Sequence, residues 1–436
     1  MVIANSDSNT TLVNLDQYYH DLKFAETVPT TTDGTFASSE ERLEDELQRT
    51  ELCVEDWCSS WIDDDTVVKT KLLPLYLPQD GKFVDKIVLS HIGSLRESCE
   101  ELLLRTKPRY YTSKSNTRLL YVAQGERANA TAREFDVLVS DKATTCHIMA
   151  LRSYGSNCNN NDNFQGKQQR SAPPLTSMTH LDGTSYESCI RKMVHEHVVY
   201  QTEQSDPSLC CSDSKEVEVV TIEMHIMGGF DDPDSTSSNI TDWLVALLAR
   251  IARDYKKGHT AFSNNDSPIS LQMVLKTCAV TSMNDTGRSC PVGRGLGIDL
   301  KTGEVFLAKC HSNATGPVPV LRSVRLWSKN NRQGPTLSVI HSVTERSALP
   351  GRVVVRPFRF APFPDIHYFL TLSDDDLVRY TSTSPDVEED GFCQEVRASM
   401  KFLLQQHPYM IFGRKLDQPL VFSRTHHANE WKQAAC

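Results

Sequence analysis

The chain has 436 residues with 39% hydrophobic content, which is enough to bury a large core in one big domain or two smaller ones. Its net charge of −10 argues against nucleic acid as a partner, because phosphate binding needs a concentrated basic face and no stretch supplies one. No apolar run approaches the roughly 18 residues of a membrane-spanning helix, and the first residues lack the features of a signal peptide. We therefore expect a soluble globular protein.

The first 70 residues differ in composition from the rest of the chain. Met1–Ser39 is rich in Ser, Thr, Asn and Asp and poor in apolar residues, which is typical of disordered segments. From Ser39 to about Ser60, a capping signature opens an acidic stretch that predicts a short helix. We interpret residues 1–70 as an acidic, partly disordered extension, and residues 71–414 as a single domain followed by a C-terminal tail at 415–436.

Two strands are predicted between Val137 and Leu151, separated by a polar turn at Ser140–Lys142. The second strand carries Cys146 in an otherwise apolar setting. A low-complexity stretch, rich in Asn, Gln and Pro, follows at about residues 155–174 and predicts a loop insertion. Leu175–Leu181 then alternates as a strand does, and it closes in the Asp182-Gly183 turn.

The remaining elements alternate between helical and strand patterns without the regular strand–helix–strand order of a parallel sheet. This mixture favours an α+β fold, a β-sheet sandwich with flanking helices. The glycine-rich Gly293–Gly297 lacks the spacing of a nucleotide-binding loop and predicts a hairpin instead. The other predicted elements are a helix at Tyr186–Tyr200, a strand at Glu216–Met227 ended by Gly228-Gly229, a helix at about Asp242–Lys257 capped by Thr241, and helices at Asp374–Thr381 and about Phe392–His407.

Cys146 is a candidate nucleophile that needs a histidine as its base. His147 is adjacent in sequence, but successive strand side chains point to opposite faces, so His180 is the better candidate. A single cysteine in a strand is nevertheless more often an inert core residue. Three functions therefore stay open: a hydrolase, a cysteine peptidase or acyltransferase with the same pair, and a non-catalytic binding module in which Cys146 is inert; under the resemblance described next, that module would bind N-terminal residues.

Four segments carry a resemblance to a known family. Ser140–Ile148 (SDKATTCHI), Thr179–Thr184 (THLDGT), Met224–Phe230 (MHIMGGF) and Thr381–Pro385 (TSTSP) occur in this order in a chain that resembles the protein N-terminal asparagine amidohydrolase family from about Leu73 to about Phe412. That family consists of cysteine hydrolases that convert the side-chain amide of an N-terminal Asn to Asp. Where the family tends to have His-Val-Asp, this chain has Asp-Ile-His at 365–367, so no role is carried over there.

The resemblance implies a fold similar to the chemotaxis receptor deamidase and cytotoxic necrotizing factor group, with β-sheets packed together and helices outside. It also implies a catalytic set of Cys146, His180 and Ser140, in which Ser140 orients the imidazole. Backbone N–H groups near Thr145 and Cys146 are expected to bind the oxyanion. Asp182 is a candidate for binding the substrate's α-ammonium, although an Asp-Gly turn explains it equally well.

No cofactor or metal is expected. Cys210 and Cys211 are adjacent, and His195 and His197 face different ways on a predicted helix, so neither pair suits zinc. The thirteen cysteines include no Cys-x-x-Cys pair, which indicates free thiols in a reducing cytosol. The resemblance implies a cytoplasmic or nuclear monomer that acts on proteins with a free N-terminal Asn and feeds the N-degron degradation pathway.

Overall fold

The computed structural model describes residues 99–105, 107–155, 173–203, 218–256, 269–285, 291–328, 336–345, 351–425 and 430–434. These residues all belong to one compact unit, Trp61–Cys436, while the other unit, Met1–Ser60, lies outside them. The predicted N-terminal extension and nearly all of the insertion at 155–174 therefore fall outside the described residues.

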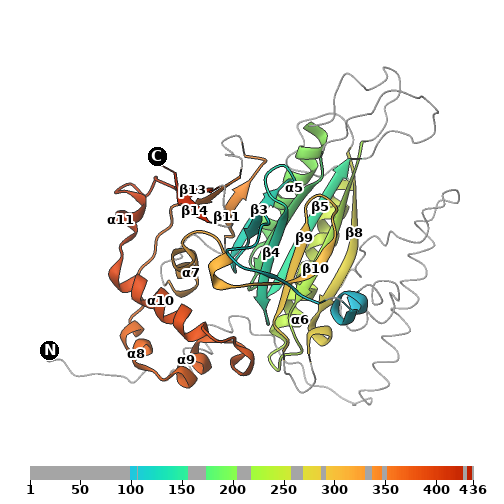
Figure 1. Ribbon diagram of the computed structural model, residues 1–436. Helices are drawn as coiled ribbons and strands as arrows, with labels where there is room; N and C mark the ends of the chain where they lie inside the picture. The colour runs from blue at the N-terminus through green and yellow to red at the C-terminus, as the bar shows by residue number, and fades with distance from the viewer. Residues whose placement is uncertain are drawn as a thin grey trace, which may run out of the picture. The chain divides into compact units, whose positions relative to one another are not determined.

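A six-stranded mixed sheet forms the centre of the unit (Figure 1). Its middle strands run antiparallel to their neighbours, and the outer pairs β11/β3 and β7/β8 are parallel. In spatial order the strands are β11 (Ser338–Ser342), β3 (Glu126–Ala130), β6 (Leu175–Leu181), β5 (His147–Gly155), β7 (Glu218–Gly228) and β8 (Ile269–Val280).

A second sheet of five strands packs on one face of the first. Its strands β9 and β10 form the hairpin that the glycine-rich segment predicted. In spatial order they are β1 (Arg109–Tyr111), β10 (Val305–Cys310), β9 (Arg294–Asp299), β4 (Val137–Ala143) and β2 (Leu119–Tyr121).

Two long helices, α5 (Glu187–Glu203) and α6 (Thr236–Lys256), pack on the opposite face of the six-stranded sheet. Strand alternation assigns each side chain to one of these two faces. On β6, Ser177 bonds to His197 of α5 at 2.8 Å, whereas His180 bonds to Ser140 of β4 at 2.9 Å. Odd-numbered residues of β6 therefore face the helices, and even-numbered residues face the second sheet.

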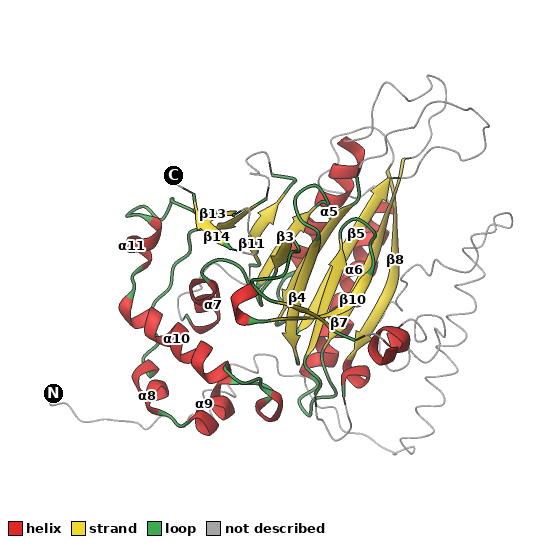
Figure 2. Cartoon of the chain, viewed as in Figure 1, coloured by secondary structure: helices red, strands yellow, loops and turns green. Residues whose placement is uncertain are grey.

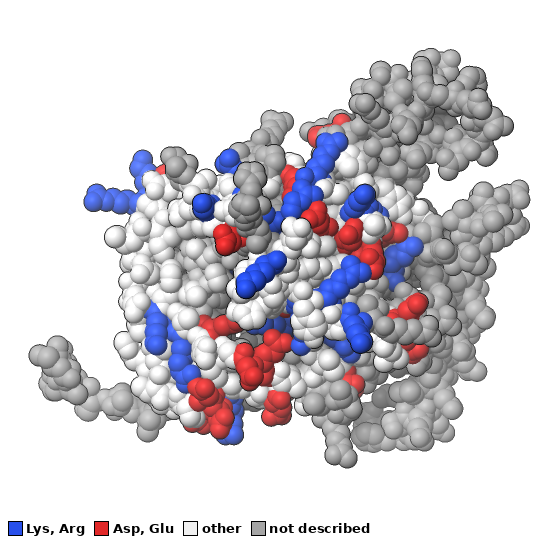
Figure 3. Space-filling view, viewed as in Figure 1, with Lys and Arg blue, Asp and Glu red and all other residues white. Residues whose placement is uncertain are grey.

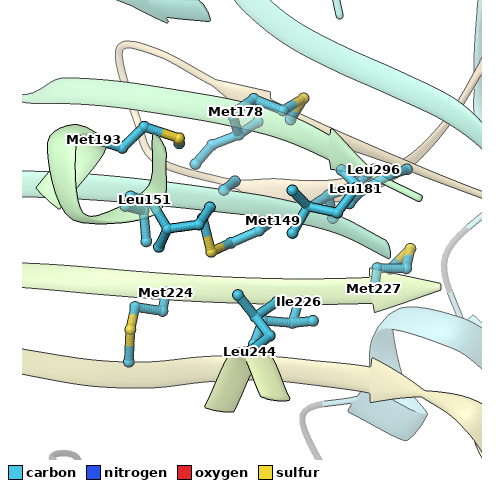
Figure 4. Close-up of a cluster of buried hydrophobic side chains, with 14 of the residues drawn as sticks. Met149, Leu151, Met178, Leu181, Met193, Met224, Ile226, Met227, Leu244 and Leu296 are labelled. Carbon is cyan, nitrogen blue, oxygen red and sulfur yellow. The ribbon is translucent and has the colours of Figure 1, made fainter. Parts of the chain in front are cut away.

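The largest hydrophobic core fills both interfaces of the six-stranded sheet. Figure 4 shows part of it, where Met149 and Leu151 of β5 lie near Ile226 of β7 and Leu244 of α6. All four side chains are fully buried. At about 1.5 to 3 kcal/mol for each such side chain, this core is a main source of the stability that holds the helices and sheets together.

The C-terminal part adds a smaller sheet and a helical cluster with its own apolar core. Strand β13 (Leu420–Arg424) pairs with β12 (Arg352–Val355) on one side and with β14 (Trp431–Gln433) on the other, so ordered structure continues past residue 414, where the sequence suggested a tail. The helices of this part are α7 (Pro319–Trp327), α8 (Ile366–Thr371), α9 (Asp374–Thr381), α10 (Phe392–Gln405) and α11 (Pro408–Phe412). Short helical turns also occur along the described chain, at η1 (Glu101–Arg105), η3 (Thr281–Asn284), η4 (Ser312–Ala314) and η5 (Pro385–Val387).

The predicted α+β class is confirmed, with mixed sheets and several helices (Figure 2). The closer relation to the chemotaxis receptor deamidase group stays a prediction. Within the described ranges no helix is long and apolar enough to cross a membrane. On the face drawn in Figure 3, basic and acidic side chains are interspersed rather than gathered by sign.

Three local predictions were wrong: the turn at Ser140–Lys142, the strand position of Cys146, which ends the turn before β5, and the start of the long helix. Ser140–Lys142 does not form a turn but lies inside β4, because Ser140 and Asp141 find partners there: Asp141 accepts hydrogen bonds from the Tyr121 hydroxyl at 2.7 Å and the Cys310 backbone N–H at 2.6 Å. The turn comes instead at 144–146.

The start of α6 was also misplaced. The helix begins at Thr236, five residues before the predicted cap Thr241. Asp232 accepts the backbone N–H groups of Thr236 and Ser237, both at 2.8 Å, and so satisfies the first turn. Thr241 is consequently inside the helix and buried, where its hydroxyl is available to a side chain of the sheet.

Four buried histidines predict that acid weakens the fold. Burial lowers the pKa of His147, His197 and His225 to about 3 and that of His180 to about 4, from an ordinary 6.5. The unfolded chain therefore takes up these protons first as the pH falls below 6.5, and each histidine lowers the free energy of unfolding by about 1.4 kcal/mol per pH unit until its folded-state pKa is reached.

Urea unfolding between pH 7 and 5 measures this loss. We expect the free energy of unfolding to fall steeply below pH 6.5, and His225→Gln to reduce the slope by about one proton. A slope that is unchanged in this variant would show that His225 is protonated in the folded protein.

Candidate active site

A buried serine and histidine join the two sheets. Ser140 Oγ of β4 lies 2.9 Å from His180 Nδ1 of β6, and the two residues are 0% and 3% exposed. The Nε2 atom of His180 is buried and has no hydrogen-bond partner among the described residues. When Nδ1–H donates to Ser140, Nε2 is left unprotonated and able to accept a proton.

Cys146 lies at the end of the turn between β4 and β5. Its carbonyl accepts a hydrogen bond from the Gly229 N–H at 2.9 Å, so the pairing of β5 with β7 continues through this residue. Ile148 lies opposite His180 in the β5/β6 ladder, which makes Cys146 a diagonal neighbour of His180 on the same face. The β5/β6 register therefore places Cys146 and His180 on the face of the six-stranded sheet that meets Ser140 of the second sheet. The Cys146 sulfur does not hydrogen-bond to His180 Nε2, which has no partner among the described residues.

His147 lies on the opposite face, as strand alternation predicts. Its Nε2 atom is 2.7 Å from the Thr241 hydroxyl of α6, and its side chain is fully buried. Thr241, first interpreted as a helix cap, is thus the partner of His147. The imidazole of His147 faces the helices and not the second sheet, where Ser140 and His180 meet.

A pair of glycines at the end of β7 packs against the cysteine turn. Gly228 and Gly229 both have positive φ, at 119° and 70°. A Cβ on Gly228 would lie 2.3 Å from the Cys146 carbonyl oxygen, and one on Gly229 would lie 2.7 Å from the His147 ring. The sequence indicated only that these glycines end a strand, but here they are required because β7 approaches the turn so closely.

Asp182 lies beside Cys146. The β5/β6 register pairs His147 with Leu181, so extending it by one residue places Cys146 opposite Asp182. Gln124 donates to one carboxylate oxygen of Asp182 at 3.1 Å, and the Tyr186 hydroxyl donates to the other. Sequence reasoning missed Gln124 and Tyr186, although Tyr186, four residues after Asp182 near the start of α5, is close enough along the chain to be considered.

Thr145 joins the turn to the C-terminal part of the chain. Its hydroxyl lies 2.8 Å from that of Thr383, and its backbone carbonyl accepts from the Ser237 hydroxyl at 3.4 Å. Thr383 belongs to the TSTSP segment, for which the sequence suggested no role. In the same segment Ser382 donates a hydrogen bond to Glu388, whose charge acts on Cys146.

The electrostatics favour a neutral pair. Burial, followed by the negative charges of Asp182 and Glu388, raises the pKa of Cys146 to about 12. Burial lowers the pKa of His180 to about 4. At neutral pH the site therefore holds a thiol and an unprotonated imidazole, and a proton acceptor is needed before the sulfur can attack.

A cysteine beside a buried Ser–His pair, on sheets covered by helices, defines a candidate cysteine hydrolase. Comparison with known proteins specifies the family: the model for protein N-terminal asparagine amidohydrolase matches residues 109–433. The chain belongs to this family of hydrolases. The matched range includes Ser140, Cys146, His180 and Asp182.

Similar curated proteins carry the same name. A human protein N-terminal asparagine amidohydrolase is 27% identical over 295 residues, covering 66% of this chain and 76% of the human protein. The mouse protein is 27% identical over 290 residues, covering 65% of this chain and 74% of its own length. An Arabidopsis thaliana protein of the same name is 22% identical over 326 residues, with 72% and 80% covered.

Proposed function

We propose that this protein hydrolyses the side-chain amide of an N-terminal asparagine in proteins or peptides, giving N-terminal aspartate and ammonia. The supporting observation is the orientation of His180. Its Nδ1 atom is bonded to Ser140, and its Nε2 atom is unpartnered among the described residues, on the sheet face to which the register also assigns Cys146. The family membership and the names of the similar proteins specify the substrate class.

The proposed reaction has two halves. His180 Nε2 removes the proton from the Cys146 thiol while sulfur attacks the amide carbon, which gives a tetrahedral oxyanion. His180 then returns the proton to the leaving nitrogen as the C–N bond breaks, which releases ammonia and leaves a thioester. In the second half His180 takes a proton from water as the oxygen attacks the thioester carbon. The C–S bond then breaks, His180 returns the proton to sulfur to regenerate the thiol, and the carboxylic acid that leaves gives its own proton to the released ammonia, which forms a carboxylate and ammonium.

Two further groups are assigned under this proposal. The backbone N–H groups of Thr145 and Cys146 would stabilise the oxyanion, at about 3 to 4 kcal/mol for each donor. Asp182 would bind the substrate's α-ammonium, because Gln124 and Tyr186 hold its carboxylate beside Cys146. Each carboxylate oxygen of Asp182 still has a lone pair for an ammonium hydrogen.

Substrate discrimination is the expected result of holding both ends of the residue. When the α-ammonium is fixed at Asp182 and the amide carbon at Cys146, Gln places its amide one methylene too far for attack. We expect Asn-initiated peptides to be deamidated, and Gln-initiated, N-acetylated and internal-Asn peptides to react about a hundredfold more slowly or worse in kcat/KM. Asp182→Asn should raise KM most for the free-amine substrate.

Ammonia release from peptides that differ only at the first residue measures this selectivity. Equal kcat/KM for Asn and Gln peptides would rule out fixation at two points. Binding without ammonia release would indicate a non-catalytic module, and cleavage or transfer of the peptide chain would indicate a peptidase or acyltransferase.

The cellular role follows from the same proposal. An N-terminal Asp produced in this way would enter the N-degron pathway of protein degradation. We propose that the protein acts there as a monomer in the cytoplasm or nucleus, with no cofactor. Abundance of reporter proteins that begin with Asn or Asp, in cells with and without the protein, tests the role.

A further inference from the structure

A segment far along the chain lies against the cysteine turn. Thr383 contacts Thr145 at 2.8 Å across 238 positions of sequence, and Glu388 follows five residues later, after η5. Ser382, the neighbour of Thr383, donates a hydrogen bond to Glu388, so this contact brings the Glu388 carboxylate to the side of the cysteine turn. Asp182 lies at the same turn by the β5/β6 register, so two carboxylates from distant parts of the chain meet there.

Neither carboxylate, that of Asp182 or that of Glu388, is ion-paired with a basic side chain in the part of the chain that the structure describes. The nearby cation Lys142 pairs with Glu395 at 3.2 Å, and Lys309 pairs with Glu389 at 3.0 Å. Burial raises the pKa of Glu388, while the hydrogen bond from Ser382 and the charge of Lys142 oppose the rise.

Two other groups at the site also have unmet hydrogen-bonding capacity. His180 Nε2, on the same sheet face as Cys146, has no partner among the described residues although its side chain is only 3% exposed. The Ser384 hydroxyl, in the segment that contains Thr383 and Glu388, is likewise unpartnered within the described chain at 4% exposure. Buried polar groups are normally satisfied, so His180 Nε2 and the Ser384 hydroxyl are both available to a polar ligand.

We propose that Glu388 is the second carboxylate of the ammonium site, and that the substrate's α-ammonium binds between Asp182 and Glu388. This inference rests on the proposed function and makes Glu388 a specificity-determining residue. An ammonium has three hydrogens to donate, so two carboxylates can bind it at once. A substrate without the free amine would leave both negative charges beside the reacting sulfur.

The arrangement also makes the cysteine respond to its substrate. In the free protein the two carboxylates disfavour a thiolate at Cys146, while the neighbouring His180 is neutral and the pKa of Tyr186 is raised. A bound ammonium offsets the charge of Asp182 and Glu388, and therefore lowers the pKa of the Cys146 thiol. The sulfur becomes reactive when a free N-terminus is in place.

Glu388→Gln tests the proposal, with Glu389→Gln as the matched control. The amide introduced at position 388 would keep an acceptor for the Ser382 hydroxyl, and Glu389 is an exposed neighbour paired with Lys309. The substrates are an Asn-initiated peptide and the same peptide without its α-amine. We expect Glu388→Gln to lower kcat/KM at least about tenfold for the free-amine peptide, mainly through KM, and not for the desamino peptide. Glu389→Gln should change neither.

A second measurement does not depend on turnover. Iodoacetamide modification of Cys146 at pH 7, followed by mass spectrometry, gives a rate that follows the fraction of thiolate. In the unsubstituted protein an Ala-initiated peptide, which has the ammonium but no side-chain amide, should give faster modification than the same peptide without its α-amine, which shields the sulfur in the same way. In Glu388→Gln the rate without peptide should be higher, and the difference between the two peptides should be smaller.

The two measurements distinguish the role of Glu388 in the ammonium site from the proposed deamidation reaction. If Glu388→Gln matches Glu389→Gln in both, the ammonium site does not include Glu388, whether or not peptides are deamidated. If no peptide is deamidated but the Ala-initiated peptide speeds modification of Cys146, relative to its form without the α-amine, only when Glu388 is present, the ammonium site stands and the proposed reaction is wrong.

Discussion

Cys146→Ala should reduce ammonia release from an Asn-initiated peptide by at least about 10⁴-fold in kcat, because no other group at the site can form the thioester. The substitution removes only a sulfur from a partly buried side chain, so we expect the melting temperature to stay close to that of the unsubstituted protein. Ammonia release and thermal unfolding are measured on the same samples.

Cys189→Ala is the matched control. Cys189 is also a partly buried free cysteine, but it lies on α5, which covers the face of the six-stranded sheet opposite to the Ser140–His180 pair. It should keep full activity. Substantial activity in Cys146→Ala, or its loss only in Cys189→Ala, would remove Cys146 from the role of nucleophile.

His180→Ala should lower kcat by about 10²- to 10⁴-fold, the usual contribution of a general acid–base group. The variant leaves Ser140 Oγ without its partner and the Cys146 thiol without a proton acceptor. His147→Gln should keep kcat nearly unchanged in the folded protein, because its side chain faces Thr241 and α6.

Stability must be matched in this comparison, since both histidines are buried and either substitution can weaken the fold. Urea unfolding curves give the folded fraction at the assay temperature, and kcat is corrected to that fraction. An essential His147 together with a dispensable His180 would reverse the assignment of the base.

The sequence predicted the part of the site that depends on local periodicity. Alternation along Leu175–Leu181 predicted strand β6, and the same rule predicted that the side chains of His147 and Cys146 point to opposite faces. It failed at Ser140–Lys142, because three polar residues in a row resemble a turn unless their distant partners are known. The partners of Ser140 and Asp141 include His180 and Cys310, which are 40 and 169 positions further along the chain.

The missed residues share a physical cause. Thr383 reaches Thr145 across 238 positions, and Gln124 reaches Asp182 across 58, so no local pattern contains these contacts. The glycine pair at 228–229 was visible as a strand end. Its close approach to Cys146 depends on how β7 lies beside β5, which only the folded register shows.

The contact between Ser140 and His180 makes the chemistry sensitive to events far from it. The serine and the histidine belong to different sheets, so the 2.9 Å between Ser140 Oγ and His180 Nδ1 depends on the relative position of the two sheets. A slip of either layer would rotate the imidazole before any strand separated. Changes of volume deep between the sheets, where Met178 and Leu296 are fully buried, should therefore alter turnover at temperatures at which the protein is still folded.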